Sequence, residues 1–361
     1  MTTQHSEQRI KSLLRLVAQQ GASDLHLVVG RYPTLRLDGK LYPLTQESIL
    51  TPEDTQALSY IMMTEDNKKK LLDEGQVDFS YNFEEKARFR TNVFFQKGNI
   101  SVAMRLVAGR IRTLEELSLP PTLYEFTHKP QGLLLVTGPV GHGKSTTLSA
   151  LIDFINHNDD KHIVTIEDPI EYVYEQDRCI INQREVGRDT KSFQEGLRSI
   201  FREDANVVLI GELRDLDTIS TAMTAAETGH LILATLHTND SSQTVDRIID
   251  VFPAHQQNQM RSQLASVLLG VVSQRLLPKV GGGRIPVLEI MMNNHAVENL
   301  IRENKSYQID SVIETSLREG MVSLDKSLAD LVQRGLITAD DAFMYAKNRE
   351  YLQMLVGRKM A

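Results

Sequence analysis

The segment 138–145, Gly-Pro-Val-Gly-His-Gly-Lys-Ser, restricts the possible folds of this chain more than any other stretch. An apolar run at 133–136 precedes it, and a helical pattern at 145–156 follows it. A G-x-x-x-x-G-K-[ST] motif binds phosphate groups when it connects a buried strand to a helix, and the spacing here predicts that setting. A glycine turn that binds nothing is the alternative interpretation, and the flanking elements weigh against it.

The residue types in this loop suit a nucleoside triphosphate. Backbone N–H groups of a glycine-rich turn can surround phosphate oxygens, and the helix N-terminus adds partial positive charge. Lys144 can reach the β- and γ-phosphates, and the Ser145 hydroxyl can take one coordination position of Mg²⁺. The motif assigns no side-chain role to His142. We expect the whole loop to bind ATP, through Gly138, Pro139, Val140, Gly141, His142, Gly143, Lys144, Ser145 and Thr146.

The composition is that of a soluble globular chain with two or three domains. Of its 361 residues, 41% are hydrophobic and 24% are charged. The formal net charge of −7 argues against nucleic acid as the main partner. Cys179 is the one cysteine, which excludes an internal disulfide and indicates a reducing compartment. No signal-peptide pattern or membrane-length apolar stretch is visible, so we expect a cytoplasmic or peripheral protein.

Residues 1–109 are predicted to form a small α+β domain. The pattern gives an amphipathic helix at 7–19 and a second helix at 51–72, which Thr51 caps. Turns are expected at Asp38-Gly39 and Gly98-Asn99, between strands at 24–29, 34–44, 77–83, 87–95 and 100–107. Residues 110–121 lose this periodicity and end in two prolines, which predicts a linker.

Residues 122–292 alternate strands with helices, which predicts an α/β fold with a mostly parallel sheet covered on both faces. The strands are expected at 133–136, 163–167, 207–211, 231–235 and 285–291. The helices are expected at 145–156, 192–202, 217–227, 243–250 and 255–277. The last part of the chain, 293–361, is predicted to be a helical region.

Polar side chains follow several of these strands where ligands of such sheets bind. Glu212 ends an apolar strand, and we expect it to activate the attacking water. The residue before it is Gly211 rather than an aspartate, so Glu167 or Glu171 is expected to support Mg²⁺ together with Ser145. A helix N-terminal acid is the alternative interpretation for Glu212.

Two histidines flank one predicted strand, at 231–235. His237 follows it and is expected to contact the γ-phosphate, whereas His230 precedes it and is a weaker candidate for a role in the site. A hydrogen-bonded structural histidine is the alternative for both.

Arg88, Arg90 and Arg105 lie on predicted strands of the N-terminal domain. Arginines on strands are usually solvated, and this is one interpretation. The other is that they reach a triphosphate bound by another domain or subunit, where they would neutralise charge in the transition state.

These segments together resemble the secretion ATPase superfamily, and specifically the type IV pilus retraction ATPases of the PilT type. The resemblance covers nearly the whole chain. Its marks are Gly-Ala-Ser-Asp-Leu-His-Leu at 21–27, Ala-Arg-Phe-Arg-Thr-Asn at 87–92, the aspartate box at 165–171, Asn-Gln-Arg-Glu-Val at 182–186, the Walker B segment at 211–215, and the histidine box at 226–230 and 236–238.

The resemblance implies a homohexameric ring in which a PAS-like N-terminal domain packs on the RecA-like domain of the next subunit. Nucleotide would then lie between domains, so that Arg88, Arg90 and Arg105 approach it. Hydrolysis would change the angle between the domains and produce mechanical work. The implied partners are the inner-membrane platform protein, through it the pilin filament, and a possible second retraction ATPase.

Two features bear on retraction as opposed to assembly. Assembly ATPases of this superfamily commonly carry a longer N-terminal region and a four-cysteine zinc site, which one cysteine excludes here. The retraction type carries A-I-R-N-L-I-R-E, and this chain has Ala-Val-Glu-Asn-Leu-Ile-Arg-Glu at 296–303. Glu298 reverses a charge of that motif. An accessory retraction paralogue, an assembly or type II secretion ATPase, a nucleotide-gated regulatory module and a DNA-translocating motor are the alternatives.

Overall fold

The computed structural model describes residues 3–37, 39–83, 87–107 and 110–357. The chain divides into two compact units, which are considered one at a time. The first comprises Met1–Arg110 and Pro169–Val173, and the second comprises Ile111–Asp168 and Tyr174–Ala361. The short segment Pro169–Val173 therefore joins the first unit, although the sequence places it within the 122–292 core.

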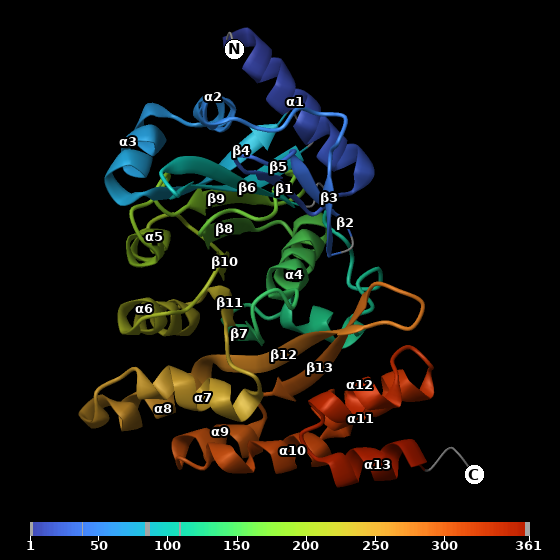
Figure 1. Ribbon diagram of the computed structural model, residues 1–361. Coiled ribbons are helices and arrows are strands. Elements are labelled where there is room, and N and C mark those ends of the chain that lie inside the picture. The colour runs from blue at the N-terminus through green and yellow to red at the C-terminus, as the bar shows by residue number, and fades with distance from the viewer. Residues whose placement is uncertain (1–2, 38, 84–86, 108–109, 358–361) are drawn as a thin grey trace. The chain divides into compact units, whose positions relative to one another are not determined.

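The first unit is an antiparallel six-stranded sheet in the order β3-β2-β1-β6-β5-β4 (Figure 1). Helices α1 and α2 pack on each other and share one hydrophobic core with the sheet. The elements are α1 (Thr3–Gln20), β1 (Asp24–Leu27), β2 (Thr34–Leu37), β3 (Lys40–Pro43), α2 (Pro52–Met62), α3 (Glu65–Glu74), β4 (Gln76–Phe83), β5 (Ala87–Gln96) and β6 (Asn99–Val107).

The predicted α+β character of this unit is confirmed, with one error at the helix expected over 51–72. Thr51 does cap a helix, because its side chain accepts a hydrogen bond from the Asp54 backbone N–H, and the Asp54 carboxylate accepts one from the Thr51 backbone N–H. That helix ends at Met62, and Thr64 adopts an extended backbone and caps α3, because its side chain accepts a hydrogen bond from the Asn67 backbone N–H. A second N-cap residue inside an apolar pattern thus divides one predicted helix into two. Asp38 of the predicted hairpin turn lies outside the described residues.

The second unit is built on a seven-stranded sheet in the order β13-β12-β7-β11-β10-β8-β9, in which β13 alone is antiparallel to its neighbour. Its elements up to the last strand are η1 (Pro121–Phe126), β7 (Gly132–Thr137), α4 (Lys144–Asn158), β8 (His162–Glu167), β9 (Ile180–Glu185), α5 (Phe193–Ile200), β10 (Val207–Ile210), α6 (Leu216–Glu227), β11 (Leu231–Leu236), α7 (Ser241–Asp250), α8 (Ala254–Val267), β12 (Leu268–Pro278) and β13 (Arg284–Met292).

Helices cover both faces of this sheet, as the sequence predicts. Figure 1 shows α5 and α6 on one side and α4 on the other. Leu133 and Leu135 of β7 belong to the core shared with α5, α6 and α8, and successive side chains of a strand alternate between faces. All residues of β7, β10 and β11 are buried, which explains their continuous apolar sequences.

The helix predicted over 255–277 is wrong in its second half. Helix α8 ends at Val267, and the chain continues directly as strand β12, which pairs with β7 on one side and β13 on the other. A strand buried on both faces has no alternation, so its apolar run is indistinguishable by period from a buried helix. Gly270 marks the strand instead, because a Cβ there would lie 2.5 Å from the carbonyl oxygen of Met291. The polar edge strand β9 was also not predicted.

The C-terminal region is helical, as predicted, apart from a single bridge between Ile290 and Val322. Helix α11 packs on β13, and α11, α12 and α13 share a separate apolar cluster. The elements are α9 (His295–Arg302), η2 (Ser306–Gln308), α10 (Ile309–Thr315), η3 (Leu317–Glu319), α11 (Leu324–Gln333), α12 (Ala339–Tyr345) and α13 (Arg349–Gly357). Among the residues that the structure describes, none of the helices is long and apolar enough to cross a membrane.

Candidate functional site

The loop between β7 and α4 requires glycine at both glycine positions of its motif. Gly138 has φ +138°, and a Cβ there would lie 2.2 Å from the backbone oxygen of Gln274. Gly143 has φ +83°, and its Cβ would lie 2.9 Å from Gln274 Nε2. Gly141, which the motif does not specify, has φ +78° but nothing within 4 Å. The loop therefore lies against β12, and its two motif glycines permit that approach.

Gln274 of β12 anchors the loop, and sequence reasoning missed it. Its side chain is 3% exposed. Its Nε2 donates to the His142 backbone oxygen at 2.9 Å, and its Oε1 accepts from Thr147 Oγ1 at 2.7 Å. One amide side chain thus connects the loop to the first turn of α4. A glutamine inside the run 267–277 is the signal that identifies it, but the apolar pattern there predicts a helix instead.

His142 also holds the loop to β12, through its side chain. Its Nδ1 accepts a hydrogen bond from the Leu276 backbone N–H at 2.9 Å. This bond requires the neutral ring, because a protonated imidazole has no acceptor. Burial, followed by the nearby Arg275 and Arg284, lowers the pKa of His142 below its ordinary value.

The lowered pKa of His142 predicts a pH-dependent contribution to stability. The neutral ring contributes in full above the ordinary pKa of about 6.5, and the contribution is lost as the pH falls through the lowered pKa. In His142→Asn the side-chain oxygen can accept the same bond without titrating. Urea unfolding from pH 8 to pH 5 should show wild type losing more stability than this variant below about pH 6.5. Parallel profiles would contradict the assigned bond.

A continuous chain of polar contacts crosses the carboxyl edge of the sheet and connects the loop to the predicted water-activating residue. Lys144 Nζ lies 3.1 Å from His237 Nδ1, and His237 Nε2 lies 3.1 Å from Glu212 Oε1. Arg214 Nε donates to the other Glu212 oxygen at 2.7 Å. Lys144 is 7% exposed and also donates to the backbone oxygens of Gly138 and Pro139. The structure therefore brings together three predicted site residues from three strand ends.

The partners of His237 determine its tautomer. An ammonium group donates only, so Nδ1 accepts from Lys144, and Nε2 then carries the proton and donates to Glu212. The ring lies between the cation that the motif provides for phosphates and the carboxylate proposed to orient water. A movement of Lys144 can therefore displace Glu212 through the His237 ring.

The turn after β10 is held so that Glu212 faces His237. The Leu213 backbone N–H donates to the Thr235 backbone oxygen at 3.0 Å, and the Thr235 hydroxyl donates to the Gly211 backbone oxygen. Gly211 in turn lies against β8, where its added Cβ would be 3.4 Å from the Cα of Glu167. The small residue that replaces the expected aspartate lets the β8 and β10 ends approach closely.

Glu167 reaches the same edge, at the end of β8. It is 8% exposed and accepts hydrogen bonds from Thr165 Oγ1 at 2.6 Å and Gln183 Nε2 at 3.4 Å. Ser145 is half-buried in the first turn of α4. Within the described part of the chain no cluster of three or more His, Cys, Asp or Glu side chains could hold a metal ion alone. The Ser145 hydroxyl and the Glu167 carboxylate fit a Mg²⁺ ion that is bound together with the phosphates of the nucleotide. Proteins usually hold Mg²⁺ through one or two carboxylates and the phosphates of the substrate.

Of five other predicted residues, four belong to the first unit and one, His230, lies at the opposite edge of this sheet. Glu171 belongs to a segment of the first unit. Arg88 and Arg90 lie on β5 and Arg105 on β6 of that unit, where Arg105 Nε donates to Asp24 Oδ1 at 2.9 Å. His230 precedes β11, and its backbone oxygen accepts from the Gly132 N–H, at the amino edge of the sheet.

His230 is therefore separated from the loop by the length of a strand. Strand β11 has six residues, which span about 20 Å. The Nδ1 of His230 lies 3.1 Å from the Ala225 backbone oxygen, and its ring contacts Phe201 edge-on at 5.6 Å. These are contacts of a structural histidine, so the proposed role of His230 in this site is not supported by its position.

Comparisons with known proteins identify the family of this chain. The sequence profile of the Type II/IV secretion system protein family matches residues 2–282. The type IV pilus retraction ATPase PilT of Pseudomonas aeruginosa is 45% identical, with 94% of this chain and 98% of that protein covered. The type IV pilus ATPase PilU of the same organism is 36% identical over 96% of this chain and 91% of its own length. A crystal structure of the pilus retraction motor PilT with bound ADP has a TM-score of 0.89 and 46% identity, covering 95% of this chain and 98% of that one.

The fold and site define an ATPase with a phosphate-binding loop on a mostly parallel sheet. The chain belongs to the Type II/IV secretion system protein family, and it is an ATPase of that family.

Proposed function

We propose that this chain is a Mg²⁺-dependent ATPase motor that powers type IV pilus retraction, and with it twitching motility, as a homohexameric ring. The observation that carries the proposal is the similarity to a retraction ATPase over nearly the whole length of both chains. In this chain Lys144, His237 and Glu212 also form one connected site. The domain boundaries 1–109, 110–121, 122–292 and 293–361 are part of the same proposal.

Each residue of the connected site has a role in hydrolysis. Lys144 leaves its loop carbonyls for the β- and γ-phosphates and neutralises charge there. Glu212 orients a water molecule toward the γ-phosphorus and accepts its proton. His237 orients the Glu212 carboxylate through its Nε2–H and contacts the γ-phosphate when ATP is bound. Mg²⁺ on Ser145, with Glu167 in support, supplies further charge neutralisation when bound.

The arginines of the first unit give the motor its dependence on subunit arrangement. Arg88, Arg90 and Arg105 are proposed to approach the triphosphate from a neighbouring subunit, with Glu171 as additional support for the metal. Arg105 is 70% exposed at its side chain, and the buried Asp24 carboxylate would keep a second cation, Arg36 at 3.5 Å, when Arg105 leaves it. A head-to-tail contact that closes into a ring would place each N-terminal unit against the next nucleotide.

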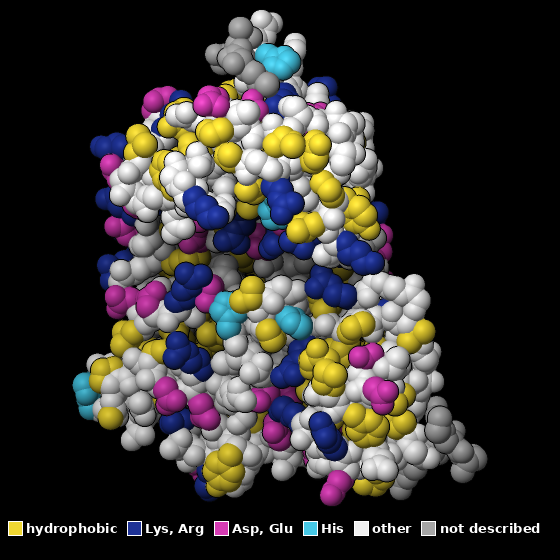
Figure 2. All heavy atoms as spheres, in the orientation of Figure 1, with side chains coloured by type: hydrophobic (Ala, Val, Ile, Leu, Met, Phe, Trp, Pro, Cys, Tyr) yellow, Lys and Arg dark blue, Asp and Glu magenta, His cyan; other side chains and the backbone are white. Residues whose placement is uncertain are grey.

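Retraction is favoured over the alternatives by particular observations. The chain is 45% identical to PilT and 36% identical to PilU, so the accessory role is the second candidate. Glu298 does not disturb its helix, because its carboxylate pairs with Arg302 at 3.0 Å and His295 at 3.6 Å. The second unit intersperses acidic and basic side chains on the face shown in Figure 2, unlike the one-sign surface typical of DNA-binding proteins.

The proposed location is the cytoplasmic face of the inner membrane, bound to the platform protein and through it to the pilin filament. A second retraction ATPase is proposed as a further partner in the same assembly.

Deleting the gene in its host tests the proposal. We expect cells with many surface pili and no twitching, because pili would still be assembled but not withdrawn. Electron microscopy of surface pili and a surface motility assay measure both. Cells without pili would mean assembly and would contradict the proposal. Many pili with partly retained movement would favour the accessory role.

A further inference from the structure

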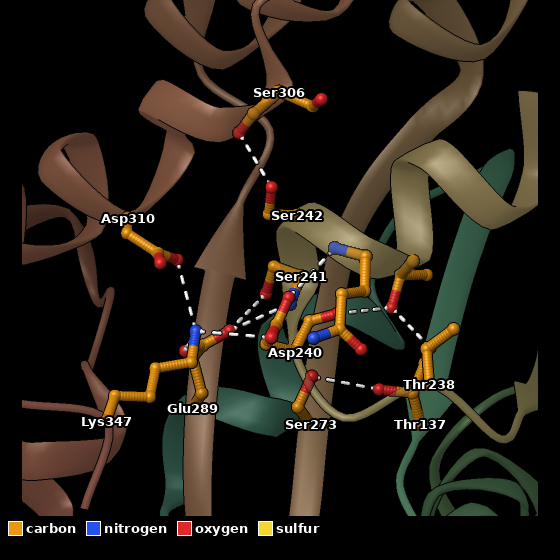
Figure 3. A network of polar contacts seen from close by, with 12 residues as sticks. Thr137, Thr238, Asp240, Ser241, Ser242, Ser273, Glu289, Ser306, Asp310 and Lys347 are labelled. Atoms are coloured by element: carbon orange, nitrogen blue, oxygen red, sulfur yellow. Dashed lines mark hydrogen bonds and ion pairs between the residues drawn. The ribbon is translucent and has the colours of Figure 1, made fainter.

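A buried polar network joins the C-terminal helices to the start of α7, four residues after His237 (Figure 3). Glu289 of β13 is 2% exposed. Its Oε1 accepts two hydrogen bonds from Ser241, one from the backbone N–H and one from the hydroxyl, each at 2.8 Å. Asp240 caps the same helix through the Gln243 N–H at 2.8 Å. Two carboxylates, those of Glu289 and Asp240, therefore fix where α7 begins.

Lys347 completes this network from the other side. It lies between α12 and α13, and its Nζ donates to Glu289 Oε2 at 2.8 Å. The same ammonium lies 3.7 Å from Asp240 and 3.2 Å from Asp310. In the part of the chain that the structure describes, Lys347 is the one cation that forms an ion pair with Glu289 or Asp240. Figure 3 shows its Nζ placed among all three carboxylates.

The position of Lys347 is itself fixed by main-chain contacts. The N–H groups of Lys347 and Asn348 both donate to Asp325 of α11, at 2.9 Å each. Burial lowers the pKa of Lys347, but the surrounding carboxylates raise it more, so the net pKa lies above its usual range and the side chain stays charged. A buried carboxylate without this cation would be costly, because an uncompensated charge would remain in the core.

The short connection between this network and His237 makes it relevant to hydrolysis. Only Thr238 and Asn239 separate His237 from Asp240. Thr238 is hydrogen-bonded to Thr244 on the first turns of α7 at 2.6 Å, so this connection follows the start of the helix. A shift of the α7 N-terminus would therefore move the histidine that bridges Lys144 and Glu212.

We propose that Lys347 is a positioning residue for ATP hydrolysis, which acts through Glu289 and Ser241 on the segment that carries His237. The inference rests on the proposed function of His237 and Glu212. The C-terminal helices thereby influence the turnover of bound ATP. They leave nucleotide binding itself to the loop at 138–146.

The test compares Lys347→Met with a matched control, Lys326→Met. Lys326 belongs to the same helical region and pairs with Asp330 four residues along α11, with a side chain 34% exposed against 28% for Lys347. We expect kcat of Lys347→Met to fall between about 10- and 100-fold, since misplaced catalytic groups have effects of this size. Its Kd for a fluorescent ATP analogue should stay within twofold of wild type, and Lys326→Met should resemble wild type in both.

Two further variants separate positioning from folding. Lys347→Arg retains the charge and should recover most of the turnover. Ser241→Ala removes one of the two bonds to Glu289 and should lower kcat by a smaller factor with Kd unchanged. If Lys347→Met turns over like wild type, or if its kcat and Kd worsen together with a fall in Tm that Lys347→Arg does not correct, the inference is wrong. Glu212→Gln, measured alongside, tests the proposed function separately. If the proposed function is wrong, this variant hydrolyses ATP at the wild-type rate.

Discussion

Gly138→Ala is expected to weaken ATP binding by at least about 30-fold, whereas Gly141→Ala should weaken it much less. A methyl group at 138 would lie 2.2 Å from the Gln274 backbone oxygen, so the loop or strand β12 must move. Overpacking of this kind costs about 1–3 kcal/mol, and a backbone conformation that residues with a Cβ rarely adopt adds about 1–3 kcal/mol. At Gly141 only the cost of the positive φ applies, because no atom lies within 4 Å of an added Cβ.

Equilibrium binding of a fluorescent ATP analogue, with Tm recorded for each variant, measures this difference. The two substitutions are chemically identical and three residues apart, so any general effect of a Gly→Ala change in this loop is the same in both variants. Equal affinities for ATP in the two variants would mean that the approach of β12 does not shape the loop.

Glu212→Gln is expected to lower the turnover of ATP by at least about 100-fold while nucleotide still binds. The amide retains the shape and can still contact His237, but it cannot accept a proton from water. Loss of a general base typically costs about 10²–10⁴ in rate. Glu227→Gln makes the same change at the end of α6, on the amino side of the sheet, and should hydrolyse ATP like wild type.

Phosphate release under saturating ATP and Mg²⁺, together with Kd for the nucleotide, measures both expectations. Glu212→Gln with unchanged turnover would assign the catalytic role elsewhere and would favour a protein that binds ATP as a regulator.

The phosphate loop and its strand were predictable because the motif is local. A strand, a turn and a helix within about 25 residues contain all the residues that the chemistry needs. The association of Lys144, Glu212 and His237 was also predictable, since carboxyl ends of parallel strands meet at one edge. The same rule separates His230 from them, because it precedes the strand that His237 follows.

Gln274 was not predictable by these means. Its role depends on β12 lying beside β7, and a strand buried on both faces carries no periodic signal. The Lys347–Glu289 pair joins residues 58 positions apart, so it requires the tertiary fold. The split of 51–72 into two helices, in contrast, was present in the sequence at Thr64, which has the side chain of an N-cap residue.

The most direct test of the account is to follow single pili on living cells in which the chromosomal copy carries Glu212→Gln. Fluorescently labelled pili, or pili attached to a bead in an optical trap, report extension and retraction separately. The account predicts that pili extend at the normal frequency and that powered retraction is lost or greatly slowed. Retraction at wild-type frequency and speed would contradict the claim that ATP hydrolysis at this site withdraws the pilus.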